Sequence, residues 1–483
     1  MNTFLIRRPA RSLLASCAVV GALLGAGAAT ATAAPPRSAA YVPGEVIVGY
    51  RPSPAPGPQA ITADLQRQLG LRTVPAAPLA SPSERLLRLR RGQSVGTALA
   101  QLRRQPGVAY AVPNYIAHAA GTSPTTPAWY PDDPGRSHKP QGWEAMQWNF
   151  LPGTGVNAPQ AWANLLADRH PGGRGVTVAI LDTGVAYRNW RSFRQSPDFV
   201  GTRFVKPYDF VAGNRYPLDH DGHGTFVAGI VAEATNNGFG LTGLAYGASI
   251  MPVRILGADG TGDAATIARG IRYAVTRGAQ VINLSLEFSL DVTSSDIPDI
   301  ISAVRFAHRR GVIVVGASGN EGVQQVAYPA RVQDVISVGA TTKDRCLANY
   351  SNDGAHLDLV APGGNDDTSL LNDPNCHYAR SLPDISQMTF FDPAKPGHFG
   401  FPGGWYGTSM AAPHVAATAA LVIASGVLGP HPSPEAVLYR LETTAQPLGS
   451  GRPNRYYGYG LVNAGAATAR VPAAATRRRY ARR

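Results

Sequence analysis

The chain has 483 residues, long enough for about three domains of average size, although a single large α/β domain often exceeds that average. Its formal net charge is +13 at pH 7, but residues 1–33 carry +3, residues 34–120 carry +7 and residues 470–483 carry +6, which leaves −3 on residues 121–469. The basic excess therefore lies outside the largest segment, and nucleic-acid binding is not supported.

Residues 1–33 have the parts of a secretory signal. Three arginines precede an apolar run at residues 13–29, and Ala-Thr-Ala ends the segment just before Ala34, where cleavage is expected. Cys17 resembles a lipid acceptor, but the apolar run lies mostly after it, which argues against lipidation. We expect a secreted protein without a stable membrane anchor, because the run is short and rich in small residues and no later segment qualifies.

Residues 34–120 are expected to form a small α+β domain. The pattern predicts strands at residues 44–50, 84–89 and 107–115 and helices at residues 61–69 and 95–103. Residues 121–131 are rich in Pro and Thr and follow as an exposed linker where processing is expected.

A buried strand leads into the first acidic residue of interest. Residues 176–181 read Val-Thr-Val-Ala-Ile-Leu and run directly into Asp182-Thr183-Gly184. This short apolar run predicts a parallel strand covered on both faces, with Asp182 at its carboxyl end. Ligands and catalytic groups of open α/β sheets collect at that edge.

A histidine opens the next block, in which His223-Gly224-Thr225 begins a helix of small residues. A metal site built on His220-x-x-His223 and the neighbouring aspartates is the competing interpretation. It leaves the following Gly-Thr and a distant serine block without a role. We therefore interpret His223 as a catalytic base and His220 as a local structural residue.

Strands and helices alternate through the rest of residues 121–469. This alternation predicts an α/β fold with a doubly wound, mostly parallel sheet and helices on both faces. Residues 363–404, rich in Gly, Pro, Asn and Asp, are expected to form a long surface insertion. The predicted strands are residues 253–256, 281–286, 312–315 and 335–338, and the predicted helices are residues 264–277 and 297–309.

A serine stands where a long buried helix is predicted to begin. Residues 407–414 read Gly-Thr-Ser-Met-Ala-Ala-Pro-His, and residues 415–424 continue with small or apolar residues on nearly every face. Ser409 is then next to the unpaired N–H groups of the first helical turn, which favour a developing negative charge. The alternative is a core helix with an incidental serine, and Asp182 and His223 upstream argue against it.

Together these blocks resemble the subtilisin-like serine peptidases, the subtilases. The resemblance implies a serine endopeptidase in which Ser409 forms the acyl-enzyme, His223 is the base, Asp182 orients the imidazole and Asn320 binds the oxyanion. The rivals are a silent subtilase fold used for binding and an esterase or transamidase; a silent relative is expected to lack part of this set. The likeness covers roughly residues 133–467 and rests on Asp182-Thr183-Gly184, His223-Gly224-Thr225, residues 318–322 and residues 407–413.

By the same resemblance, residues 34–120 are an inhibitory propeptide that assists folding, occupies the active-site cleft and is removed by self-processing. A permanent accessory domain is the alternative. The expected partners are protein or peptide substrates and the chain's own propeptide. The chain then divides into a signal peptide (residues 1–33), a propeptide (34–120), a catalytic domain (121–469) and a basic disordered tail (470–483).

Residues 236–243 resemble the calcium loop of the family. Main-chain carbonyls, the Asn237 side chain and two aspartates would supply the oxygen ligands that Ca²⁺ prefers. The alternative is an ordinary Asn-Gly turn. The expected ligands are Asp133, Asp198, Thr235, Asn237, Phe239 and Leu241.

Substrate recognition is where the chain departs from the family pattern. Relatives usually have Ser-Leu-Gly-Gly on the strand that lines the cleft, whereas residues 285–288 read Ser-Leu-Glu-Phe. Side chains are added where a peptide backbone approaches closely. Glu287 and Glu321 would favour basic groups near the scissile bond, and the alternative is that Glu287 points into solvent. Residues 328–330 resemble a segment that carries a cis-proline in the family. The expected substrate-binding residues are Ser285, Leu286, Glu287, Gly319 and Glu321.

Cys346 and Cys376 are the two cysteines left once the signal is removed. In an exported protein the simplest interpretation is one disulfide. Closing a loop of about 30 residues contributes roughly 3–4 kcal/mol in the chain-entropy account. Two buried free thiols are the alternative.

Overall fold

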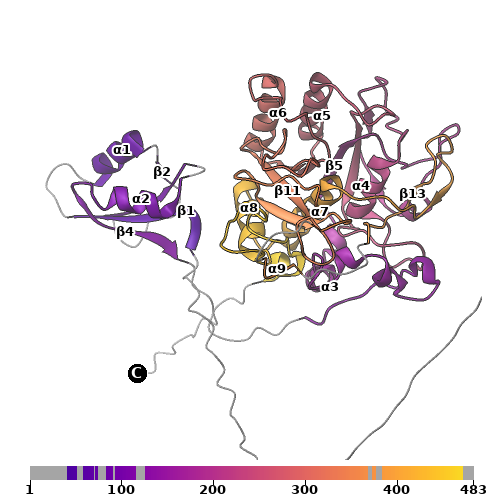
Figure 1. The fold of residues 1–483 in the computed structure, drawn as a ribbon, viewed down its shortest axis with the longest axis horizontal. Helices are drawn as coiled ribbons and strands as arrows, with labels where there is room; N and C mark the ends of the chain where they lie inside the picture. The colour runs from indigo at the N-terminus through magenta and orange to yellow at the C-terminus, as the bar shows by residue number, and fades with distance from the viewer. Residues whose placement is uncertain are drawn as a thin grey trace, which may run out of the picture. The chain divides into compact units, whose positions relative to one another are not determined.

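The structure is a computed structural model that describes residues 41–51, 58–69, 71–73, 83–90, 93–115, 126–367, 373–376 and 383–470. The expected signal peptide, the first part of the expected linker and all but the first residue of the expected tail lie outside these residues. The described residues divide into two compact units, one formed mainly by residues before 117 and one mainly by residues after (Figure 1).

The first unit is a four-stranded antiparallel sheet with two helices, in the strand order β2-β3-β1-β4. Val46 and Leu87 on the strands and Leu65 and Leu102 on the helices are buried, so the unit has a small core of its own. The predicted α+β pattern is confirmed, with one two-residue strand added. The elements are β1 (Tyr41–Tyr50), α1 (Pro58–Leu69), β2 (Arg72–Thr73), β3 (Glu84–Arg88), α2 (Val95–Leu102) and β4 (Val108–Tyr115).

The second unit is built on a parallel sheet in the order β12-β11-β10-β9-β5-β8-β6, with β7 also paired to β8. The chain leaves β5 for β8 on one side and later returns to β9 on the other side. The winding therefore changes direction beside β5, which is where open α/β sheets place their sites. The strands are β5 (Thr177–Asp182), β6 (Arg203–Phe204), β7 (Tyr208–Asp209), β8 (Ser249–Arg254), β9 (Val281–Leu284), β10 (Ile313–Ala317), β11 (Val335–Thr341) and β12 (Leu359–Pro362).

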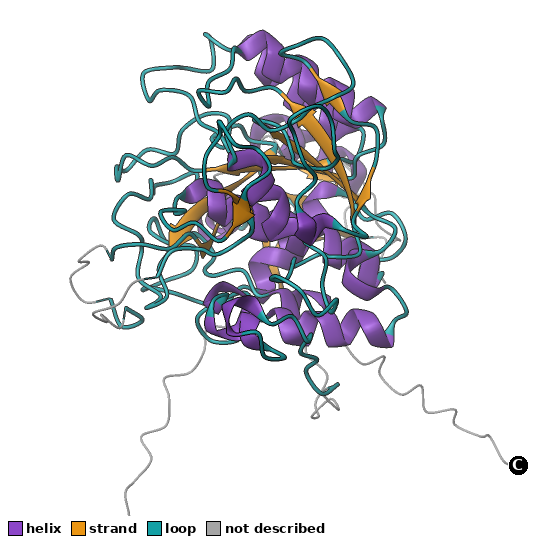
Figure 2. Ribbon diagram, turned by 90° about the vertical axis from the view of Figure 1, so that its right-hand side faces the viewer, coloured by secondary structure: helices purple, strands orange, loops and turns teal. Residues whose placement is uncertain are grey.

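Successive residues of β5 show why helices cover both faces. Val178 and Ile180 belong to the hydrophobic cluster that contains α4 and α7, whereas Ala179 and Leu181 belong to the cluster that contains α5 and α6. Side chains alternate along a strand, so a continuous apolar run needs cover on both sides. Figure 1 shows these two groups of helices on either side of β5 and β11, and Figure 2 shows the strands enclosed by helices and long loops. The helices are α3 (Ala158–Ala167), α4 (His223–Ala232), α5 (Ala264–Thr276), α6 (Pro298–Arg309), α7 (Thr408–Ser425), α8 (Pro434–Thr444) and α9 (Ala464–Thr468).

The helix α7 is the centre of this unit. It packs against β9, β10, β11 and β12 and against α4. Its length and composition are sufficient for a membrane span, but 89% of it is buried inside the protein. Small residues on nearly all its faces allow this close packing, so α7 is a core helix.

Residues 383–390 correct the expectation of an insertion lying on the surface. Ile385 and Met388 are buried, and the N–H of Met388 donates to Glu233 Oε1 at 2.8 Å. The hydroxyl of Thr389 donates to the carbonyl of Gly222, directly before α4, at 2.9 Å. The insertion as a whole is rich in Gly, Pro, Asn and Asp, which is typical of exposed loops. It nevertheless contains a short buried run at residues 385–390. A small hairpin, β13 (Thr389–Phe390) with β14 (Phe399–Gly400), completes this segment.

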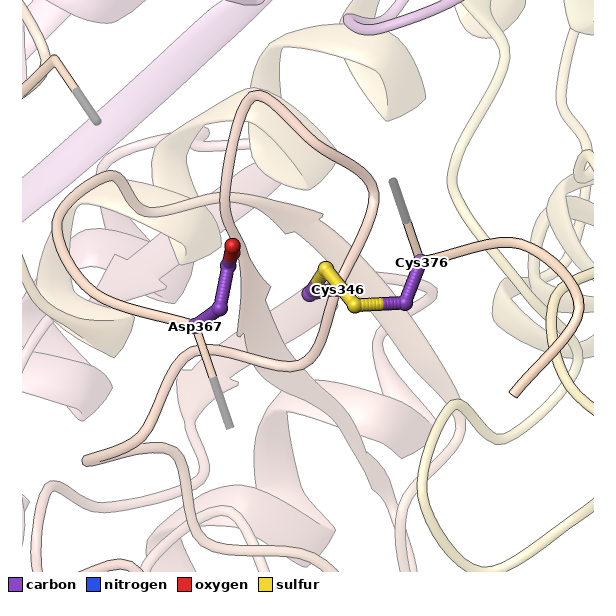
Figure 3. A group of neighbouring side chains, drawn as sticks. All are labelled: Cys346, Asp367 and Cys376. Atoms are coloured by element: carbon purple, nitrogen blue, oxygen red, sulfur yellow. A yellow bond between two sulfur atoms is a disulfide. The ribbon is translucent and has the colours of Figure 1, made fainter. Parts of the chain in front are cut away.

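Cys346 and Cys376 form a disulfide with a Cα–Cα distance of 4.4 Å, which confirms the predicted pairing. Figure 3 shows Asp367 beside the bond. The carboxylate of Asp367 accepts a hydrogen bond from the hydroxyl of Thr342. Although the three side chains are close enough to share a metal ion, both sulfur atoms are used in the disulfide and are not thiolate ligands. Cys346 and Cys376 therefore form a covalent cross-link between two segments of the chain rather than a metal site.

Candidate active site

Asp182 and His223 are in contact at the carboxyl edge of the sheet. Asp182 is the last residue of β5 and is fully buried, and its Oδ1 atom lies 2.8 Å from Nδ1 of His223, the first residue of α4. Gly224 permits this approach, because a Cβ there would lie 2.1 Å from the carbonyl oxygen of Gly184. The end of the strand and the start of the helix thus hold a carboxylate against an imidazole.

Acidic neighbours raise the pKa of His223. Burial alone would lower this pKa, but the charge and hydrogen bond of Asp182 and the charges of Asp221 and Asp219 outweigh burial. Asp221 also accepts a hydrogen bond from the backbone N–H of His223 at 3.0 Å. An imidazole in this setting is a stronger base than free histidine, and its protonated form is stabilised.

Asp219 anchors the first turn of α4. Its Oδ2 atom accepts hydrogen bonds from the N–H and the hydroxyl of Thr225, at 2.8 and 2.5 Å. Its Oδ1 atom accepts from the N–H of Gly222 and from the hydroxyl of Thr183, both at 2.9 Å. This one carboxylate therefore ties the start of α4 to the residue after Asp182, and fixes where His223 stands.

Ser409 is the second residue of α7 and lies beside the end of β9. The hydroxyl of Ser285, which follows β9, donates to the carbonyl of Ser409 at 2.7 Å, and the Ser409 hydroxyl donates to the carbonyl of Ser285 at 3.3 Å. Because β9 pairs with β5, Ser285, which contacts Ser409, and Asp182 stand at the ends of adjacent strands. The backbone N–H of Ser409 belongs to the first turn of α7, where N–H groups lack partners within the helix.

Asn320 lies on the loop after β10 and contacts both α7 and Glu287. Its Oδ1 atom accepts hydrogen bonds from the N–H and the hydroxyl of Thr408, at 2.8 and 3.0 Å. Its Nδ2 donates to Glu287 Oε1 at 3.1 Å, and its backbone N–H donates to Glu287 Oε2 at 3.0 Å. The amide is thereby fixed with its oxygen toward α7 and its nitrogen toward the segment after β9.

The other predicted substrate-binding residues surround this loop. Glu321 is exposed and accepts a hydrogen bond from Asn352 Nδ2 at 2.5 Å. Gly319 has a φ of +113°, and a Cβ there would lie 2.6 Å from Glu287 Oε2 and 2.1 Å from Asn352 Nδ2. The Tyr328–Pro329 peptide bond is cis, as the family resemblance implies. Thus Glu287, Gly319 and Glu321 are brought together, and Ser285 lies beside them against Ser409.

The loop expected to bind calcium lies against two of the predicted ligands, Asp133 and Asp198. Asp133 and Asp198 are fully buried, and their carboxylates accept hydrogen bonds from backbone N–H groups of Asn236 (2.8 Å) and Leu241 (2.7 Å). Gly240 allows Asp198 to approach the loop, because a Cβ there would lie 1.9 Å from Asp198 Oδ2. The whole segment that includes Thr235, Asn237, Phe239 and Leu241 thus folds around two buried carboxylates.

Glu233, which sequence analysis did not identify, joins the same cluster. It is buried, and its carboxyl group shares a side-chain hydrogen bond with that of Asp198. Burial raises the pKa of Asp198 to about 8 and that of Asp133 to about 6, and burial together with the charge of Asp198 raises the pKa of Glu233. In the described part of the chain none of the three forms an ion pair. A buried acidic cluster of this kind is suited to a hard cation, which would supply the missing positive charge.

Comparison with known proteins decides the family. The profile of the subtilase family matches residues 173–460, and that of the fervidolysin N-terminal prodomain matches residues 27–114. The chain belongs to the subtilase family. A thermophilic serine proteinase of Bacillus sp. (strain AK1) is 32% identical over 429 residues, which cover 88% of this chain and 87% of the relative. Subtilisin BL of Lederbergia lenta is 39% identical over 296 residues, covering 61% of this chain and 91% of the relative.

A solved protease from Pseudoalteromonas arctica supports the same assignment, with a TM-score of 0.56 and 29% identity over 70% of this chain and 98% of that structure. This subtilase is therefore a serine endopeptidase that carries a prodomain, and the predicted family, fold class and enzyme class are confirmed. The predicted blocks at residues 182–184, 223–225 and 407–413 all lie within the matched range.

Several residues of the subtilase site were not identified from the sequence. In the sequence, Asp219 stands out only as one of the aspartates near His223. Asn352, whose Oδ1 accepts from the N–H groups of Glu321 and Val323 at 3.1 Å each, fixes the loop after β10 from 30 residues away along the chain. The ring of Trp405 lies 6.2 Å from that of His223. Asp219 could have been identified, because an Asp shortly before the start of a helix often caps its first turn. Asn352 and Trp405 have no comparable local pattern in the sequence.

Proposed function

We propose that this subtilase hydrolyses peptide bonds through an acyl-enzyme on Ser409. The single observation that carries the proposal is the 2.8 Å contact between His223 and Asp182 at the end of β5, beside the strand end that holds Ser409. In the free enzyme the Ser409 hydroxyl donates to Ser285, and it must turn to His223 Nε2 for attack. Such contacts commonly tighten only when substrate binds.

The proposed reaction moves one proton twice. His223 takes the Ser409 proton as the oxygen attacks the substrate carbonyl, and Asp182 stabilises the imidazolium that forms. Asn320 Nδ2 and the Ser409 N–H stabilise the oxyanion. His223 then protonates the leaving amine, the peptide bond breaks, and a water molecule repeats the sequence to release the acid and free Ser409.

The protein is proposed to be exported as a precursor and then processed. Residues 1–33 direct secretion, residues 34–120 act as an inhibitory propeptide of the catalytic domain at residues 121–469, and cleavage by the enzyme itself separates the two. The prodomain match at residues 27–114 supports a propeptide in this part of the chain. Residues 470–483 carry six arginines and are proposed to be a basic, disordered tail.

Calcium is the proposed structural cofactor. Asp133, Asp198 and the loop of Thr235, Asn237, Phe239 and Leu241 would hold the ion, with Glu233 beside them. Buried carboxylates without a counter-charge support this assignment, because each costs folding free energy unless it is paired or protonated. A bound ion would supply positive charge there, and these residues would then hold the loop to the start of the catalytic domain.

Labelling of the nucleophile tests the proposed function. A serine-directed phosphonofluoridate is expected to add to the mature enzyme once, at Ser409, with peptide mapping by mass spectrometry as the readout. In His223→Ala, which lacks the base, labelling is expected to slow by a factor of at least about 100. Labelling of another residue, or equal labelling of both proteins, would contradict the proposal.

A further inference from the structure

We infer that Glu287 is a latch on the oxyanion donor Asn320, released when a substrate places a basic side chain on the acyl side of the scissile bond. The enzyme would therefore select Lys or Arg at that position. This inference rests on the proposed function and names its substrate class.

The carboxylate of Glu287 occupies a donor that the reaction needs. It accepts one hydrogen bond from the Asn320 side chain at 3.1 Å and a second from the Asn320 backbone at 3.0 Å. The side-chain nitrogen is the group proposed to bind the oxyanion. A negative charge at this point repels the oxyanion that forms during attack, so productive binding requires that Glu287 moves away or is neutralised.

The carboxylate of Glu287 also contacts the loop that carries Asn320. Its Oε2 atom is so close to Gly319 that a Cβ there would lie 2.6 Å away, so the carboxylate lies against the backbone of the Gly319–Asn320 loop. The next residue is held in place, because the N–H of Phe288 donates to the carbonyl of Tyr328 at 2.7 Å. With this anchor, release of the latch is expected to be a rotation of the Glu287 side chain rather than a shift of the strand.

The charge around Glu287 favours a cation as the releasing group. Glu287 is half-buried, and burial together with the charge of Glu321 raises its pKa. Among the described residues, neither glutamate forms an ion pair. A guanidinium or ammonium group from the substrate would compensate this charge and draw the carboxylate off Asn320. An apolar side chain at the same position could do neither.

Peptides that differ only in the residue before the scissile bond test the inference. Arginine, its uncharged analogue citrulline and leucine are compared at this position by kcat/KM, with the mature enzyme, Glu287→Gln and Glu287→Ala. The wild type is expected to prefer arginine over citrulline by about tenfold or more, and Glu287→Gln to retain less than about twofold preference. In Glu287→Ala the leucine peptide is expected to gain in kcat, because Asn320 is free. Glu435→Gln, which removes a glutamate charge from the exposed first turn of α8, should behave as wild type.

Each other outcome counts against the inference. Equal rates on arginine and citrulline in the wild type, or an unchanged preference in Glu287→Gln, would overturn it while peptide hydrolysis itself stands. If no peptide is cleaved and Ser409 is not labelled by the phosphonofluoridate, the proposed function fails and this inference fails with it. Labelling of Ser409 in Glu287→Ala shows that the variant is folded, and Glu287→Gln preserves the shape of the side chain.

Discussion

The side-chain oxygen of Asn320 accepts two hydrogen bonds from Thr408, one from its N–H at 2.8 Å and one from its hydroxyl at 3.0 Å. Thr408 is the first residue of α7 and directly precedes Ser409. The contact therefore orients the amide with its nitrogen outward and couples it to the helix that carries the nucleophile. The contact between Asn320 and Thr408 thus positions both groups proposed to bind the oxyanion, the Asn320 side-chain nitrogen and the Ser409 N–H.

Replacing Asn320 by alanine is expected to lower kcat about 100- to 1000-fold with little change in KM, which is the cost of losing one such donor in an enzyme of this family. The donor acts on the charge that develops in the transition state, so substrate binding is largely spared. Steady-state kinetics on one peptide check this. Thr408→Ser, which keeps the hydroxyl, is the control and should lose little. A kcat within a few fold of wild type in Asn320→Ala would remove Asn320 from the mechanism.

Replacing Asp221 by asparagine is expected to move the acid limb of the kcat/KM profile to lower pH. Asp221 is one of the carboxylates that raise the pKa of His223, so removing its charge lowers that pKa. The base must be neutral, so activity appears as pH rises through the His223 pKa, and in the variant it appears earlier. Profiles between about pH 5 and 9 on a peptide without groups that titrate there provide the measurement. Asp168→Asn serves as the control, and a limb that stays in place or moves upward contradicts the account.

Removing calcium is expected to lower the Tm of the mature protein by about 4 °C, if the ion is present at about 100 times its dissociation constant. Calorimetry with and without a chelator checks this and does not depend on activity. In Asp198→Asn the chelator should have a much smaller effect, because a carboxylate ligand is lost. Asp168→Asn, at the end of α3, should respond as wild type. A chelator effect of the same size in Asp198→Asn would place the ion elsewhere.

Replacing both Cys346 and Cys376 by serine is expected to reduce the free energy of unfolding by about 3–4 kcal/mol, because the unfolded chain regains the freedom of a loop that spans a sequence separation of 30. Denaturant unfolding of an inactive Ser409→Ala background avoids self-digestion during the measurement. Reduction of the parent protein should give a similar loss. No change on reduction would mean that the bond contributes nothing to stability.

The parts that sequence reasoning reached are those with a local signal. The sequence predicts a strand at residues 176–181, and β5 spans Thr177–Asp182. The prediction is close because a short, continuous apolar run in an α/β protein is typical of a buried parallel strand. The helix α7 was recognised because small residues on all its faces require burial. Asp182, His223 and Ser409 each stand at the end of such an element, so their meeting at one sheet edge could be predicted from the topology.

The parts that were missed depend on contacts between distant segments. Glu233 reads as an ordinary helix-end glutamate, and its burial follows from the approach of Asp198 and Met388, neither of which is near it in sequence. The contact of Glu287 with Asn320 joins residues 33 positions apart. The sequence showed that Glu287 departs from the family pattern, but not that its carboxylate would occupy the nitrogen of Asn320.

The most direct test of the central claim is the intact mass of the expressed precursor beside that of Ser409→Ala, with casein digestion by both. The account predicts that the wild type loses the residues up to about position 120 and digests casein, whereas Ser409→Ala stays at its full length and is inert. The same mass and the same activity for both proteins would show that Ser409 does not perform the chemistry, and the fold would then have to be interpreted as a binding module.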